Sequence, residues 1–114
     1  MSSRTTAIVN ATSETFEETV LQSSIPVLVD FSASWCPPCQ ALKPELEAFA
    51  AETAGRVRVV LVDIDAEPEL AARYDVTSIP DLRVFENGAV VVKASGFRRR
   101  EEMRDLMAPL VTPG

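Results

Sequence analysis

The pentapeptide Trp35-Cys36-Pro37-Pro38-Cys39 constrains this chain most, because it holds the only tryptophan and the only two cysteines among 114 residues. The apolar run at 26–31 precedes it and predicts a buried strand, whereas residues 40–52 follow it and predict a helix. The motif therefore lies where a strand ends and a helix begins. Cysteines three positions apart on a first helical turn share one face, so they can close a disulfide.

This position favours redox chemistry. A helix N-terminus offers free N–H groups and a partial positive charge, and both favour an anion. We expect Cys36, as the first and more exposed cysteine, to supply that anion as a reactive thiolate. Cys36 would attack a substrate disulfide, and Cys39 would then release the product by attacking the mixed disulfide.

Three other uses of the cysteines are weaker interpretations. A purely structural disulfide would stabilise little, because loop-closure stabilisation grows with loop length and this loop is very short. A zinc site usually needs four ligands, whereas the chain has no histidine and no second cysteine pair. Two buried bystander cysteines would not explain the flanking tryptophan and prolines. The sequence therefore favours a redox pair and predicts no metal site.

Composition limits the compartment and the partners. The formal net charge of −6 disfavours a nucleic-acid partner or an anionic membrane surface. The apolar segment at 7–9 is too short for a signal-peptide core, and no run is long enough to span a bilayer. A single closely spaced cysteine pair in such a chain indicates a reducing, cytoplasmic compartment. The length predicts one domain over residues 1–114, with frayed termini at 1–6 and 112–114.

Hydrophobic periodicity and turn residues predict an α/β chain. The expected strands cover residues 7–10, 26–31, 57–65, 81–86 and 89–94, with Asn87-Gly88 as a hairpin turn before the last one. The expected helices cover residues from Thr12 or Ser13 to 22, 40–52, 66–74 and 99–111. This order predicts a central mixed five-stranded sheet flanked by four helices, with parallel early strands and an antiparallel terminal hairpin. The cysteine motif then lies at the C-terminal end of a central strand, where ligand sites gather in open α/β sheets.

Several separated motifs make the chain similar to the thioredoxin family over about residues 8–110, without an insertion. They are Val27-Leu28-Val29-Asp30-Phe31, Trp35-Cys36-x-Pro38-Cys39, Pro44, Val62-Asp63-Ile64-Asp65, Ile79-Pro80, Phe85-x-Asn87-Gly88 and Gly96. The resemblance implies the thioredoxin fold and thiol–disulfide oxidoreductase activity.

The resemblance also implies residue roles. Cys36 matches the attacking cysteine and Cys39 the resolving one. Asp30 matches a buried aspartate that relays a proton for Cys39, and burial among apolar residues would raise its pKa toward neutrality. The alternative is a solvated aspartate at a strand end. Pro80 matches a cis-proline of the family.

A substrate-docking surface is implied as well, consisting of Trp35, Pro37, Pro38, Ile79, Pro80 and Gly96. The alternative for Trp35 is an aromatic residue of the core.

The chain departs from the family at three functional positions. Pro37 replaces the usual glycine and has no N–H, so we expect less stabilisation of the Cys36 thiolate. Leu61 replaces a lysine that many thioredoxins place near the buried aspartate, which makes that aspartate harder to ionise. Asp81 replaces the usual threonine after the loop proline, and Arg83 lies on the same strand face. These two residues could pair with each other, or Arg83 could replace the missing lysine, but a solvated arginine is the favoured interpretation.

A basic run, Arg98-Arg99-Arg100, follows Gly96 and opposes the dipole of the helix that begins there. It could steer acidic partners toward the site. A solvated run balanced by Glu101 and Glu102 is the favoured interpretation.

We therefore predict a protein disulfide reductase that acts as a general cytoplasmic electron donor. Its redox element is the Cys36–Cys39 pair, with no bound cofactor. The resemblance implies electrons from NADPH through thioredoxin reductase, a flavoprotein, and clients such as ribonucleotide reductase, peroxiredoxin and methionine sulfoxide reductase. We expect a monomer that binds neither nucleic acid nor membrane. Two alternatives remain: a specialised or exported thiol reductase of the tryparedoxin or cytochrome-maturation type, and a non-catalytic thioredoxin-like binding subunit.

Overall fold

The computed structural model describes residues 7–110. Five strands within this range form one mixed sheet. Its strands are β1 (Ile8–Asn10), β2 (Val27–Ser32), β3 (Arg58–Asp63), β4 (Asp81–Glu86) and β5 (Ala89–Ser95). Their order across the sheet is β1-β3-β2-β4-β5. β1 and β2 run parallel to β3, whereas β4 runs antiparallel to its neighbours β2 and β5.

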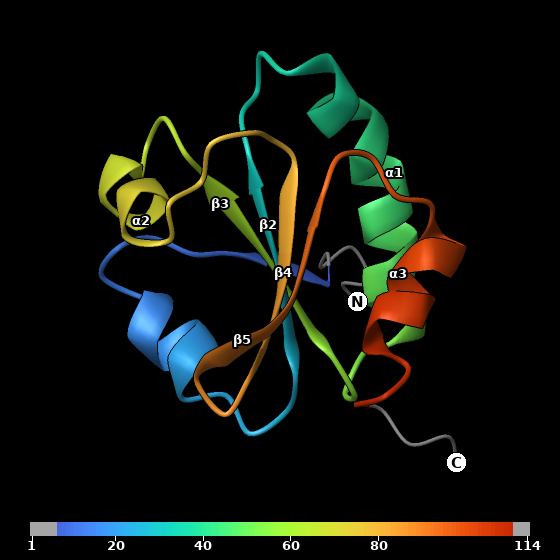
Figure 1. The fold of residues 1–114 in the computed structure, drawn as a ribbon. Coiled ribbons are helices and arrows are strands. Elements are labelled where there is room, and N and C mark those ends of the chain that lie inside the picture. The colour runs from blue at the N-terminus through green and yellow to red at the C-terminus, as the bar shows by residue number, and fades with distance from the viewer. Residues whose placement is uncertain (1–6, 111–114) are drawn as a thin grey trace, which may run out of the picture.

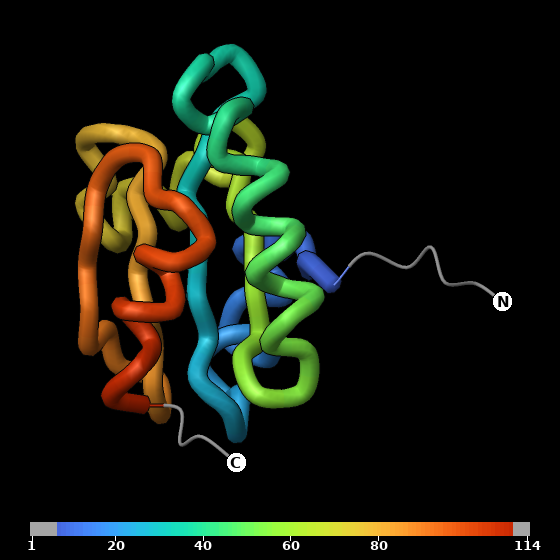
Figure 2. The backbone as a smooth tube through the Cα atoms, turned by 90° about the vertical axis from the view of Figure 1, so that its right-hand side faces the viewer, coloured from blue at the N-terminus to red at the C-terminus, as the bar shows by residue number. Residues whose placement is uncertain are grey.

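Helical segments cover both faces of this sheet. They are η1 (Glu17–Leu21), which is a π-helix, α1 (Pro37–Glu52), α2 (Pro68–Arg73) and α3 (Arg100–Met107). Figure 1 shows the sheet nearly edge-on, with η1 and α2 on its left and α1 and α3 on its right. Figure 2 faces the α1 side, where α1 and α3 lie next to each other. The predicted α/β arrangement of a mixed five-stranded sheet and four helices is confirmed.

The middle strand, β2, is buried on both faces because its sequence is almost continuously apolar. Leu28 belongs to the core beneath α1 and α3, while Val29 and Phe31 belong to the core beneath η1 and α2. Side chains alternate along a strand, so Asp30 shares the α1 face with Leu28. The one charged residue of β2 therefore lies close to the point where the chain enters α1.

The helix predicted from Thr12 or Ser13 begins only at Glu17. Thr12 instead closes a turn, in which its Oγ1 accepts the Thr15 N–H at 3.2 Å. Ser13 donates its backbone N–H to Glu67, the residue before α2, at 2.9 Å. This contact joins residues far apart in the sequence, so local capping rules do not anticipate it.

Three other boundaries differ from expectation. β3 ends at Asp63 because its carboxylate accepts the Asp65 N–H and closes a turn. α3 ends at Met107, and position 111 of the predicted helix lies outside the described residues, as do the termini predicted to fray. α1 begins at Pro37, so the cysteine motif forms its first turn.

Candidate active site

The two cysteines lie at the N-terminus of α1. Cys36 is the N-cap residue and forms a disulfide with Cys39, with 5.2 Å between the two Cα atoms. The Cys39 N–H donates to the Cys36 sulfur from 3.3 Å. Pro37 and Pro38 fill the first two helical positions and have no N–H to offer. Among the described residues, Cys39 therefore supplies the single first-turn N–H that reaches the Cys36 sulfur.

Both cysteines are buried, with Cys36 3% exposed and Cys39 4% exposed. The expectation that Cys36 is the more exposed cysteine is wrong for this disulfide form. Ala33, Ile64 and Ile79 pack against the pair and cover both residues. Ala33 follows β2 and is close to the pair in sequence. Ile64 follows β3 and Ile79 precedes β4, so these two contacts come from loops that are distant in sequence.

The Cys36 side of the disulfide faces the loop before β4. The Cys36 sulfur lies 4.0 Å from the Ile79 carbonyl oxygen. The Ile79–Pro80 peptide bond is cis, as the family pattern implies. The Pro80 carbonyl accepts the Gly96 N–H at 2.8 Å, so the end of β5 joins the same loop. Cys36, Ile79, Pro80 and Gly96 therefore lie together.

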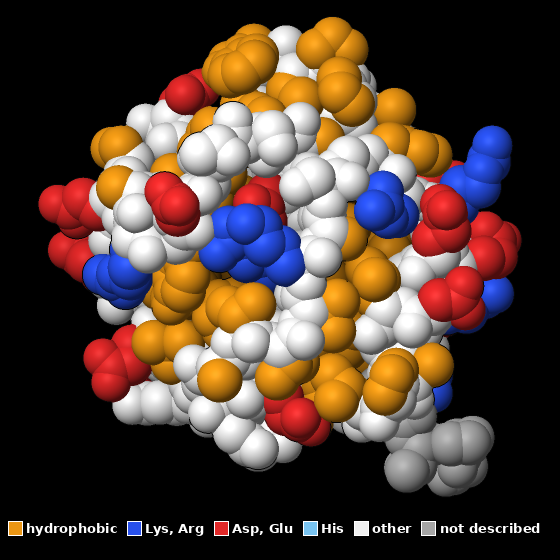
Figure 3. Space-filling view, in the orientation of Figure 1, with side chains coloured by type: hydrophobic (Ala, Val, Ile, Leu, Met, Phe, Trp, Pro, Cys, Tyr) orange, Lys and Arg blue, Asp and Glu red, His pale blue; other side chains and the backbone are white. Residues whose placement is uncertain are grey.

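An apolar surface borders this cluster. Trp35 is 64% exposed, so the alternative of a core aromatic is wrong. Its Nε1 donates to the Asp65 Oδ2 at 2.7 Å, which holds the indole at the surface. Pro37 and Pro38 are exposed beside it. Figure 3 shows hydrophobic side chains gathered at the top of the molecule, over the start of α1 and the adjoining loops.

Phe97 adds an aromatic side chain that the sequence analysis does not name. It follows Gly96 directly and is 38% exposed. An apolar residue immediately after the family's Gly96 is the signal that could have identified it.

The Cys39 side of the disulfide faces a cavity of about 380 Å³. The carboxyl group of Asp30 and the backbone and side chains of α1 line this cavity together with Cys39. Asp30 is 2% exposed, so the solvated alternative is wrong. Its Oδ1 has no hydrogen-bond partner within the described residues. Burial, supplemented by the negative charge of Asp81, raises the pKa of Asp30 to about 7.

Leu61 is the β3 residue in register with Asp30, and it also lines the cavity. The family's lysine would therefore stand directly beside the carboxyl group, where this chain has an apolar side chain. Lys43 of α1 lines the same cavity, but it is exposed and is not among the causes of the raised Asp30 pKa. Within residues 7–110, no cation forms an ion pair with this carboxyl group.

Asp81 and Arg83 form a buried ion pair at the start of β4. The Arg83 Nε and Nη2 donate to the two Asp81 carboxylate oxygens, each at 2.9 Å. The guanidinium lies 5.6 Å from the ring centre of Phe31 and 5.9 Å from that of Tyr74. The pair is one of the alternatives that the sequence left open, and the favoured interpretation of a solvated Arg83 is wrong. Phe31 faces the η1 and α2 core, so Arg83 lies across the sheet from Asp30 and does not replace the missing lysine.

The part of the chain that the structure describes offers neither a metal site nor a membrane-spanning helix. Within residues 7–110, no group of three or more histidine, cysteine, aspartate or glutamate side chains is placed to hold a metal ion. No helix of this part of the chain is long and apolar enough to cross a membrane.

Comparisons with known proteins agree with this geometry. Residues 7–109 match the family model described as Thioredoxin. The chain is 44% identical to "Thioredoxin" of Streptomyces clavuligerus over 105 residues, which is 92% of this chain and 91% of that protein. It is 43% identical to "Thioredoxin C-2" of Corynebacterium nephridii over 96 residues, covering 84% of this chain and 89% of that protein. "Thioredoxin" of Staphylococcus aureus is 41% identical over 101 residues, covering 89% of this chain and 95% of that protein.

Proposed function

Because the chain belongs to the thioredoxin family and is a protein-disulfide reductase, we propose that Cys36 is its attacking cysteine and Cys39 its resolving cysteine. The observation that carries this assignment is the asymmetry around the disulfide. Cys36 faces the apolar surface at Ile79, whereas Cys39 faces the cavity that contains Asp30. A client disulfide approaches Cys36 from the side of the apolar surface. The proton of Cys39 is transferred on the other side, in the cavity.

In the first step, the Cys36 thiolate attacks one sulfur of a client disulfide. The client S–S bond breaks, a mixed disulfide forms, and the departing client sulfur takes up a proton. The Cys39 N–H and the positive end of the α1 dipole stabilise the Cys36 thiolate before the attack.

In the second step, Cys39 gives its proton to the Asp30 carboxylate and attacks the Cys36 sulfur. The mixed disulfide breaks, the second client sulfur leaves as a thiolate that takes up a proton from water, and the Cys36–Cys39 disulfide forms. Two electrons pass from the protein to the client. A pKa of about 7 keeps a substantial share of Asp30 in each protonation state near neutral pH, which suits a group that accepts and returns a proton.

We assign client docking to the surface of Trp35, Pro37, Pro38, Ile79, Pro80 and Gly96, to which Phe97 is added. Ile79 lies outside β4, and its N–H makes no hydrogen bond within the described residues. An extended client segment would pair with this free backbone, as in other strand-addition complexes. The exposed aromatic side chains would cover the client's apolar residues.

The remaining roles rest on family membership. Thioredoxin reductase would return electrons from NADPH to the Cys36–Cys39 disulfide. Disulfide-containing clients would include ribonucleotide reductase, peroxiredoxin and methionine sulfoxide reductase. The protein would act in the cytoplasm as a monomer.

The equilibrium reduction potential of the Cys36–Cys39 pair tests this direction of electron flow. Trp35 adjoins the disulfide, so its fluorescence can follow the redox state in dithiothreitol or glutathione buffers. If the protein is a reductase, we expect a reduction potential of about −270 mV, the value typical of thioredoxin, or lower. A value between about −120 and −180 mV, typical of oxidants and isomerases, would contradict the proposal.

A further inference from the structure

We propose that Arg98 and Arg99 make this protein prefer client disulfides that are flanked by acidic side chains. The inference rests on the proposed reductase function and adds a specificity to its docking surface. It goes against the sequence-based interpretation of the basic run as a solvated stretch balanced by its neighbours.

Arg98 lies at the edge of the docking surface. One of its guanidinium nitrogens is 3.8 Å from where a Cβ on Gly96 would lie, and it donates to the Phe97 carbonyl at 3.1 Å. Gly96 in turn bonds to the carbonyl of Pro80, the residue after Ile79. The positive charge of Arg98 is thus anchored next to the backbone that would receive a client.

The guanidinium groups of Arg98 and Arg99 are not paired with a carboxylate of the described residues. Neither forms an ion pair with an acidic side chain of the described residues, although Glu101 and Glu102 are close in sequence. The Glu102 carboxylate accepts the Arg99 backbone N–H at 2.8 Å and so caps the helix instead of pairing with a guanidinium.

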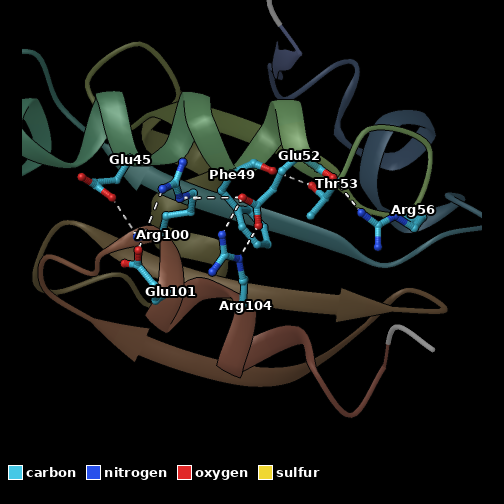
Figure 4. A network of polar contacts seen from close by, with 8 residues as sticks. All are labelled: Glu45, Phe49, Glu52, Thr53, Arg56, Arg100, Glu101 and Arg104. Atoms are coloured by element: carbon cyan, nitrogen blue, oxygen red, sulfur yellow. Dashed lines mark hydrogen bonds and ion pairs between the residues drawn. The ribbon is translucent and has the colours of Figure 1, made fainter. Parts of the chain in front are cut away.

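The next two arginines of the segment behave differently. Figure 4 shows Arg100 and Arg104 held in the contact between α3 and α1. The Arg100 guanidinium lies 3.7 Å from a Glu52 carboxylate oxygen. Arg104 donates two hydrogen bonds, from Nε and Nη2, to the two oxygens of the same carboxylate. Arg100 and Arg104 therefore serve the packing of the helices. The cations of this run that are left for a partner are Arg98 and Arg99, the two closest in sequence to Gly96.

The surrounding charge makes this position distinctive. The whole chain carries a net charge of −6, so its overall charge disfavours the approach of an acidic client. The Asp65 carboxylate borders the docking surface at Trp35, whereas the Arg98 guanidinium borders it at Gly96 and Phe97. Figure 3 shows basic side chains next to hydrophobic ones at the upper right, over the passage from β5 to α3. An acidic side chain beside the client cysteine would find its complement at this edge.

The test uses two synthetic disulfide peptides that carry either Glu or Gln on both sides of the cysteine that is attacked. The rate constant for their reduction by the reduced protein is followed through Trp35 fluorescence at low and at high salt. We expect the Glu peptide to react roughly two- to fivefold faster at low salt, because exposed charge pairs contribute modestly, and the difference to shrink at high salt. The protein with Arg98→Gln and Arg99→Gln should lose this difference.

Arg56→Gln is the control for a general effect of charge, because it removes one positive charge from an exposed arginine just beyond the far end of α1. This variant should keep the preference for the Glu peptide. The inference is overturned if the wild-type protein reduces the Gln peptide as fast as the Glu peptide, or if the preference survives in the double variant. Failure of the reductase function itself would look different, because neither peptide would then be reduced, and the inference would fall with it.

Discussion

Asp30 at the centre of the sheet and Cys39 in the first turn of α1 line the same cavity. Asp30 is buried, and one of its carboxylate oxygens has no hydrogen-bond partner among the described residues. An unpaired buried carboxyl group is costly to ionise. This cost raises the pKa of Asp30 to about 7, close to the pH at which Cys39 must lose its proton.

The cost of ionising Asp30 predicts a pH-dependent gain in stability for Asp30→Asn. Burial raises the pKa from 3.8 to about 7, so the folded protein keeps this proton over a pH range in which the unfolded chain has lost it. The contribution of Asp30 to the unfolding free energy of the wild-type protein therefore falls as the pH rises through this range. The variant should gain up to about 4 kcal/mol in unfolding free energy above about pH 7, and little near about pH 4.

Urea denaturation of both proteins across this pH range measures the difference. Asp105→Asn, which changes an exposed acid on α3, is the control and should show no such trend. A gain that is the same at all pH values would mean that Asp30 ionises normally.

Leu61→Lys tests the consequence of the missing lysine. The new ammonium group would stand beside Asp30 across the β2–β3 register and would favour its charged form. The Asp30 titration, followed by carbon NMR of the carboxyl group, should move to lower pH by roughly one unit or more. Leu61→Met keeps an uncharged side chain of similar size and should leave the titration in place. An unchanged midpoint in the lysine variant would show that the cation does not reach the carboxyl group.

The Asp81–Arg83 pair predicts a strong coupling in stability. Arg83→Met would leave the Asp81 carboxylate buried and unpaired, and such a change typically costs about 3 to 5 kcal/mol. Adding Asp81→Leu should recover much of this loss, because the stranded charge is then gone as well. A double-mutant cycle from urea denaturation gives the coupling, and additive effects of the two changes would rule out a direct pair.

Pro37→Gly tests how the motif sets the reactivity of Cys36. The change returns an N–H to the first helical position, next to the single N–H that now reaches the sulfur. The share of Cys36 present as thiolate near neutral pH should rise by roughly two- to tenfold, as measured by ultraviolet absorbance. Pro37→Ala restores the same N–H without the added freedom of glycine. If the glycine variant alone changes the thiolate, loop flexibility and not the donor is the cause.

The order of elements and the place of the cysteine motif could be predicted because both follow from local patterns. The apolar run of β2 and the Asn87-Gly88 turn are examples, since each carries its signal within a few residues. The burial of Asp30 was implied by the family resemblance, and its apolar neighbours in the same strand agree with it. These features depend little on what packs against them.

Features that depend on distant contacts could not be predicted in this way. Arg83 is buried because Tyr74, at the end of α2, packs over its guanidinium. Cys36 is covered because Ile64 and Ile79 come from other loops. The influence of Asp81 on Asp30 requires the register of β2 against β4. Each of these contacts joins residues of different secondary-structure elements or loops, which no local pattern contains.

Trapping of the mixed disulfide tests the division of labour between the two cysteines most directly. Reduced Cys39→Ser and Cys36→Ser proteins are each mixed with a disulfide peptide, and the products are identified by mass spectrometry of the intact protein. The account predicts that Cys39→Ser accumulates a stable adduct through Cys36, whereas Cys36→Ser forms little or none. A stable adduct on Cys39 in the Cys36→Ser protein, with none on Cys36 in the other, would contradict the account.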